Sequence, residues 1–107
     1  MDESEFDQLA DDTMMAIEEA VDASGADIDY DSAGGILTLE FADGSQIIVN
    51  KQAPLKQIWV AARSGGFHFD YDIEAACWRL QGKGSELFEC LSGYCSEQAG
   101  EPVRLEA

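Results

Sequence analysis

The sequence predicts an α+β protein: a two-layer α/β sandwich in which two helices pack on one face of an antiparallel sheet of about six strands. Three observations support this fold class. The hydrophobic pattern has a helical period near both ends of the chain and a period of two between them. Tight turns separate the strand-like segments, which is typical of an antiparallel meander. Two amphipathic helices can cover only one face of such a sheet.

The first helix is expected from Ser4 to about Ala23, with Ser4 as its N-cap. At about 100° per residue, its apolar side chains fall on one arc and its acidic side chains fall on the opposite arc. The pair Ser24-Gly25 ends the helix, because glycine tolerates the left-handed conformation found after helix C-termini. The helix is therefore expected to bury one face and to expose an acidic one.

Strands follow the first helix. The segment Asp27–Asp31 alternates acidic and apolar residues, which predicts a half-buried strand whose carboxylates face solvent. Glycine pairs and an Asp-Gly turn separate the next apolar segments, as in β-hairpins. The remaining strands are expected at residues 36–41, 46–50, 57–62 and 67–71 and around 77–80.

A second helix is expected from Ser85 to about Gln98, capped by Ser85 and closed by Gly100. Gly93 lies inside it and should cost about 1 kcal/mol relative to alanine. The tail beyond Gly100 is short, which predicts a poorly covered groove between the two helices. We therefore expect modest thermal stability.

Length and charge bound the class of protein. The 107 residues suit one domain, residues 1–107. The 22 acidic side chains against 6 basic ones, a formal charge of −16, exclude nucleic-acid partners and anionic membranes, which rely on Lys and Arg. The first residues are acidic, unlike a signal peptide, and we expect a soluble, cytoplasmic protein. Cys77, Cys90 and Cys95 form no CxxC pair and are expected as reduced thiols in the core or at its boundary.

The acidic residues are concentrated in residues 1–31, which hold twelve of them and no Lys or Arg. On the first helix, four carboxylates fall within about 60° of arc, and no lysine four residues away relieves their repulsion. They are Asp7, Asp11, Glu18 and Asp22. Carboxylates are hard oxygen ligands that suit magnesium, calcium, manganese and iron ions. The pattern predicts weak, multi-site cation binding or the docking of a basic protein surface. The alternative is a solvated face that keeps a small protein in solution.

Enzyme signatures are missing from the sequence, which contains no P-loop, GxGxxG, GxSxG or HExxH motif. Residues 27–31 resemble the start of an EF-hand loop, but Ser32 and Thr38 stand where that loop needs Gly and Glu. His68 is the only histidine, so a usual zinc site is excluded. We expect a protein that is not an enzyme and has no catalytic residue.

Two aromatic side chains are expected on the open face of the sheet. Ile58 and Val60 should face the helices, which turns Trp59 outward, and His68 alternates with two phenylalanines in the same way. An exposed tryptophan is either ordinary scatter or an interface anchor. We expect Trp59 and His68 to contact a partner.

These features together resemble the frataxin family, in particular its bacterial members, over nearly the whole chain. The most specific segment is Asn50–Ala61, NKQAPLKQIWVA, followed by SGGFHF at residues 64–69. Other matching segments are Ser4–Phe6, Ile17–Asp22, Asp27–Asp29, Gly34–Thr38, Phe41–Ser45, Trp78 and Gln98–Gly100.

The resemblance implies a protein that binds ferrous and ferric iron weakly, with other hard divalent or trivalent cations able to substitute. It also implies a regulator of iron–sulfur cluster assembly, or an iron donor, that binds the cysteine desulfurase and the scaffold protein and is a monomer without metal. The implied metal-binding residues are Asp7, Asp11, Glu18, Glu19, Asp22, Asp27, Asp29 and Asp31. The expected partner-binding residues are Glu18, Glu19, Asp22, Asn50, Gln57 and Trp59, with His68 added from the residue pattern.

Two other functions remain open at this point. An acidic protein could mimic phosphates and inhibit a basic nucleic-acid-binding protein. Ferroxidase catalysis would require a defined redox site, which the sequence does not show. The uncharged loop Ala23–Ala26 between the first helix and the first strand predicts fewer bound ions than in bacterial relatives that carry acids there.

Overall fold

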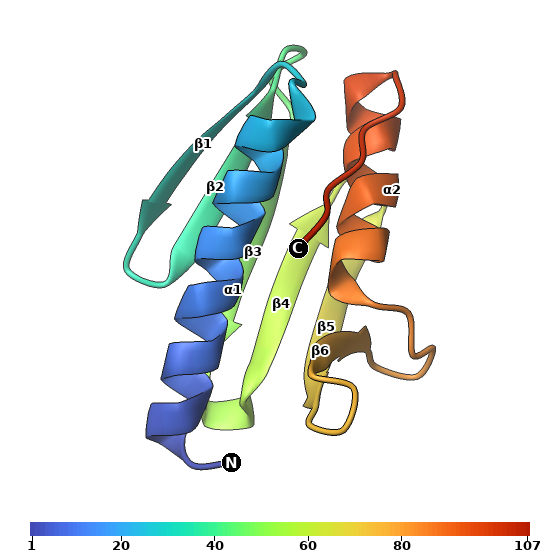
Figure 1. Ribbon diagram of the computed structural model, residues 1–107. Helices are drawn as coiled ribbons and strands as arrows, with labels where there is room; N and C mark the ends of the chain where they lie inside the picture. Colours follow the sequence, from blue (N-terminus) through green and yellow to red (C-terminus); the bar gives the residue numbers. More distant parts are fainter.

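The six strands form one sheet in the order β1-β2-β3-β4-β5-β6, and every neighbouring pair is antiparallel. This computed structural model describes residues 1–107. Both helices lie on the same face of the sheet (Figure 1), so the predicted two-layer sandwich is confirmed. The elements are α1 (Glu3–Ser24), β1 (Ile28–Ala33), β2 (Ile36–Phe41), β3 (Gln46–Gln52), the short 3₁₀ helix η1 (Ala53–Leu55), β4 (Gln57–Ala62), β5 (Gly65–Asp72), β6 (Cys77–Leu80) and α2 (Leu87–Ala99).

Both helices begin at an acidic cap rather than at the predicted serine. The Asp2 carboxylate accepts the Glu5 N–H at 2.8 Å, and the Glu5 carboxylate accepts the Asp2 N–H at 3.4 Å. This reciprocal pair is a capping box, so the assignment of Ser4 as N-cap is wrong. At α2, Glu86 accepts two first-turn N–H groups and replaces the predicted Ser85. Neither helix combines the length and apolar character needed to cross a lipid bilayer.

The core lies between the helices and the sheet and contains 22 buried apolar side chains. Helix α1 contributes one stripe that runs from Phe6 to Val21, as its period predicts. Strand β1 departs from the prediction, because Ile28 is its only buried residue and Tyr30 is 38% exposed. As the edge strand, β1 has a neighbouring strand on one side only. It is therefore an exposed strand and not a half-buried one.

The chain after α2 packs back onto the sandwich. Val103 and Leu105 are both buried in the core. Two serine hydroxyls of α2 hold this segment: Ser96 Oγ accepts the Val103 N–H at 2.8 Å, and Ser92 Oγ accepts the Leu105 N–H at 2.9 Å. The tail runs back along α2 (Figure 1). The prediction of a poorly covered groove is therefore wrong.

The three cysteines are free thiols. Cys95 is fully buried, and Cys77 and Cys90 are half-buried, which confirms their expected place in the core and at its boundary. Burial raises the pKa of the Cys95 thiol to about 12, because the thiolate would lose its hydration.

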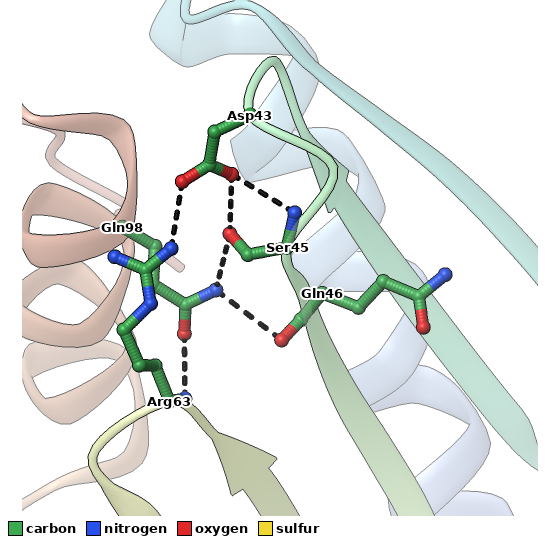
Figure 2. Close-up of polar contacts among 5 residues, drawn as sticks. All are labelled: Asp43, Ser45, Gln46, Arg63 and Gln98. Atoms are coloured by element: carbon green, nitrogen blue, oxygen red, sulfur yellow. Dashed lines mark hydrogen bonds and ion pairs between the residues drawn. The ribbon is translucent and has the colours of Figure 1, made fainter.

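A polar network joins the ends of two hairpins to α2 (Figure 2). The buried Gln98 amide donates to Ser45 Oγ at 3.1 Å and to the Gln46 carbonyl at 3.2 Å, and it accepts the Arg63 N–H at 2.9 Å. Asp43 accepts the Ser45 N–H at 2.9 Å and an Arg63 guanidinium N–H at 2.6 Å. The Ser45 hydrogen bonds, aided by Arg63, lower the pKa of Asp43 to about 2.

Candidate cation and protein-docking surface

Three carboxylates project from the exposed side of α1. Glu18 is half-buried, Glu19 and Asp22 are exposed, and none of the three forms an ion pair. Asp22 accepts a hydrogen bond of 2.8 Å from the hydroxyl of Tyr30, which ties α1 to the edge strand. This hydrogen bond is the main cause that raises the pKa of Tyr30, since ionising the phenol would break it beside a carboxylate.

More carboxylates lie on β1 and on its neighbour. Tyr30 points to α1, so Asp29 and Asp31 on either side of it point to the open face of the sheet. Asp29 lies opposite Glu40 of β2 in the strand register, and like charges in that position repel. Asp27 is exposed just before the strand. We call the resulting group the acidic edge, and it consists of Glu18, Glu19, Asp22, Asp27, Asp29, Asp31 and Glu40.

Lysine 51 changes the expected charge pattern on the first half of α1. Its Nζ lies 3.0 Å from Asp11 Oδ1 and 3.6 Å from Asp7 Oδ1. The hydrogen bond with Asp11 is the main cause that raises the pKa of Lys51. The helix itself supplies no lysine to these carboxylates, as expected, but Lys51 supplies a counter-charge from the sheet. The expectation of an unneutralised acidic surface is therefore wrong at Asp7 and Asp11. Lys51 lies on β3, which contacts α1, so the pairing crosses the two layers.

The predicted metal-binding residues are spread over α1, the turn after it and β1. Nowhere do three His, Cys, Asp or Glu side chains come together as a group that could hold a metal ion. The unpaired carboxylates share a surface rather than a coordination sphere. Such an arrangement can attract hydrated cations or a basic protein surface, because hard ions keep several of their waters when carboxylates are few.

The open face of the sheet presents a second group of predicted residues. Asn50, Trp59 and His68 lie side by side in register on β3, β4 and β5. The Trp59 and His68 rings stack, with centroids 4.3 Å apart and an angle of 8° between their planes. Trp59 is half-buried and His68 is exposed, so the outward orientation predicted for both is confirmed.

Gln57 is buried, whereas a residue that contacts a partner is expected to be exposed. It is only 7% exposed, although it belongs to the same face. Its Oε1 accepts the Trp59 indole N–H at 2.8 Å, and its Nε2 donates to Asp70 Oδ1 at 3.0 Å. Gln57 therefore holds the indole in place, while Trp59 and His68 provide the accessible surface.

Several residues of these surfaces were not predicted from the sequence. Glu40 could have been found by counting outward from the Gly34-Gly35 turn, because a two-residue hairpin loop fixes the register that brings it opposite Asp29. The Lys51–Asp11 pair left no such signal, since 40 residues separate its members. Asp70 likewise joins Gln57 only through strand pairing.

Fold and surface together define a class: a small α/β sandwich with unpaired carboxylates at one edge and a stacked Trp–His pair on its open sheet. Residues 1–101 match the family model of the Frataxin-like domain. The chain belongs to the frataxin family, which confirms the resemblance noted in its sequence.

Bacterial relatives match along almost the whole chain. The iron-sulfur cluster assembly protein CyaY of Vibrio vulnificus (strain YJ016) is 48% identical over 103 residues, which cover 96% of this chain and 97% of the relative. CyaY of Pseudomonas aeruginosa is also 48% identical over 103 residues, covering 96% and 95%. The frataxin of Psychromonas ingrahamii has a solved structure with 41% identity and a TM-score of 0.91, and the match covers 100% of both chains.

A more distant solved structure also shares the fold. It is trimeric frataxin from the yeast Saccharomyces cerevisiae, complexed with ferrous iron, with 28% identity and a TM-score of 0.67. The match covers 94% of this chain and 88% of the yeast chain.

Proposed function

We propose that this protein takes part in iron–sulfur cluster assembly as an iron-binding regulator with no catalytic activity of its own. The names of the bacterial relatives and the ferrous iron in the yeast structure support this function. The observation that carries the proposal is the lack of any ion pair at Glu18, Glu19 and Asp22. Iron binds weakly at the acidic edge, and the same edge docks on a basic patch of the cysteine desulfurase.

Mutual repulsion explains why the acidic edge takes both ligands. Glu18 and Asp22 are four residues apart on α1, a spacing at which like charges destabilise a helix. Asp29 and Glu40 oppose one another across two strands. Cations bound at either pair, or a positively charged protein surface that covers the edge, relieve these repulsions, so iron and the desulfurase compete for this surface. Complementary charge also speeds association with a basic partner, and salt weakens that effect.

Charge reversal tests the acidic edge directly. The triple variant Glu18→Lys, Glu19→Lys and Asp22→Lys should lose most of its affinity for a bacterial cysteine desulfurase and for ferrous iron measured without oxygen. Calorimetry can follow both ligands, and backbone NMR with a diamagnetic trivalent ion can locate the affected residues.

A charge-matched control separates location from total charge. Glu74, Glu97 and Glu101 are exposed, form no ion pair and lie outside the acidic edge. Their triple replacement by lysine changes the net charge by the same amount and should leave most binding intact. Equal losses in both triple variants, or no loss in either, would refute the acidic edge as the site.

The open face of the sheet is proposed as the contact for the scaffold protein, with Trp59 as its anchor. Aromatic anchors often dominate interface energies, with losses of 2 kcal/mol or more on truncation. Trp59→Ala should therefore weaken scaffold binding about 30-fold, while Ile48→Ala, an exposed neighbour on the same face, should change it little. Equal effects of the two substitutions would exclude Trp59 as an anchor.

A further inference from the structure

The outer edge of β1 presents backbone groups that no neighbouring strand uses. In an antiparallel pair, residues alternate between those that bond to the partner and those that point away from it. The Lys51 N–H donates to the Gly35 carbonyl at 3.0 Å, and the Phe41 N–H donates to the Ser45 carbonyl at 2.9 Å. Gly35, just before β2, and the odd-numbered residues of β2 therefore direct their backbone N–H and C=O groups to β3. The even-numbered residues of β2 direct theirs to β1.

This alternation decides which residues of β1 face outward. In the register, Asp29 and Asp31 lie opposite Glu40 and Thr38, so these two use their N–H and C=O groups within the hairpin. Tyr30 and Ser32 consequently direct their N–H and C=O groups to the free edge. Neither takes part in any backbone hydrogen bond made outside the helices and strands, and both residues are exposed.

Negative charge flanks this free edge on both faces of the sheet. Asp29 and Asp31 lie on the open face, while Asp22 lies on the helix face, bonded to the Tyr30 hydroxyl. Glu18 and Glu19 extend that charge along α1. Edge strands with charged side chains resist pairing with a copy of themselves. In an added strand, successive side chains point to opposite faces of the sheet. If these residues are basic, they lie near carboxylates on both the open face and the helix face.

A pocket next to the end of β1 suits one long basic side chain. It has a volume of about 250 Å³, and Ser32 lies in its wall together with the β1–β2 turn. Met14, Met15 and Ile36 provide apolar surface, and Glu18 provides a carboxylate. Lysine and arginine bury their aliphatic stems against such surfaces while the charged ends remain near solvent and carboxylates.

We propose that an extended, lysine- and arginine-rich segment of a partner protein binds by adding a strand to the free edge of β1. Main-chain hydrogen bonds to Tyr30 and Ser32 give this interaction its register, and the flanking carboxylates select a basic sequence. The inference rests on the proposed docking of a basic partner and specifies how the partner is held.

The test uses a substitution that changes the edge without changing its charge. Ser32→Pro removes the outward N–H, and proline is tolerated on the free side of an edge strand. Ser32→Ala is the matched control, because it removes the hydroxyl and keeps the N–H. The probe is an acetylated, amidated peptide of eight alternating arginine and lysine residues at low salt. Ser32→Pro should bind this peptide about fivefold more weakly than Ser32→Ala, the loss expected for one hydrogen bond.

Amide hydrogen exchange supplies an independent readout. Without peptide, the Tyr30 and Ser32 amides should exchange fast and those of Asp29 and Asp31 slowly; with peptide, all four should exchange slowly. Equal affinity of the two Ser32 variants together with unprotected Tyr30 and Ser32 amides would overturn strand addition, as would failure of the peptide to bind at all. Because neither variant alters a charge, the lysine triple variant remains a separate test of the acidic edge.

Discussion

Single residues tie the two layers of this protein together, and Gln98 is the clearest case. Its buried amide makes three hydrogen bonds with residues of two turns and a strand (Figure 2). Gln98→Leu should lower the free energy of unfolding by about 2 kcal/mol, because Arg63 N–H and the Gln46 carbonyl lose their partner. Urea unfolding followed by circular dichroism measures the loss. Glu97→Ala, an exposed change one residue earlier, should stay within about 0.5 kcal/mol of the parent.

Asp43 makes the same network sensitive to acid. Its folded-state pKa of about 2 lies below the ordinary value of 3.8, so the ionised form is favoured in the folded protein. The resulting stability is present above pH 3.8 and is lost as the pH falls from there through about 2. Asp43→Asn should therefore flatten the decline in stability across this range, measured by urea unfolding at several pH values. Asp27→Asn removes a charge that makes no side-chain hydrogen bond, and it should leave the decline in place; identical curves for both variants would contradict the role of Asp43.

At the scale of elements, a glycine in the middle of α2 lowers the stability of that helix, and alanine can replace it. Gly93 is exposed in the middle of the helix, and a Cβ added there would have nothing within 4 Å. Gly93→Ala should raise the free energy of unfolding by about 1 kcal/mol and the melting temperature by about 4 °C. Calorimetry measures both quantities.

Gly100 provides the contrasting substitution in the same helix. It ends α2 with a φ of 71°, a left-handed conformation that a side chain disfavours by about 1 kcal/mol. Gly100→Ala should therefore destabilise the protein. A shift of both alanine variants in the same direction would contradict the argument that backbone conformation decides the effect of a side chain at these two glycines.

The elements themselves could be predicted well, and their junctions less well. Periodicity located β2 and β4 with the same ends as in the structure, and it placed β6 around its observed residues. The caps were missed because serine is a preferred N-cap by residue type and lies close to each true cap: Asp2 stands two residues before Ser4, and Glu86 stands one residue after Ser85. Which side chains share a face followed from the periods, but pairs such as Lys51 with Asp11 depend on how α1 crosses β3. The local sequence pattern does not predict that crossing.

At the scale of the whole molecule, uncompensated charge limits stability. The chain has a net charge of −16, and its few ion pairs leave Glu18, Glu19 and Asp22 unmatched. In metal-free, low-salt buffer we expect modest thermal stability that rises with added sodium chloride, and more strongly with magnesium, because cations screen the repulsion. Differential scanning calorimetry at increasing salt measures this. A high melting temperature without salt or metal would contradict it.

Neutralising the three unmatched carboxylates should reproduce part of that salt effect. Glu18→Gln, Glu19→Gln and Asp22→Asn together should raise the low-salt stability by about 1 kcal/mol, since each removed like-charge contact contributes a few tenths. The triple variant should also respond less to added salt than the parent. An unchanged salt response would place the repulsion elsewhere in the molecule.

The burial of Cys95 gives this fold an intrinsic reporter of its own fluctuations. A thiol reagent in excess cannot reach a sulfur that is 0% exposed until α2 lifts from the strands beneath it. With Cys77 and Cys90 replaced by alanine, a single labelling rate would time that opening in the otherwise native chain. Comparing the labelling rate with and without added iron would show whether the ion changes how often α2 opens.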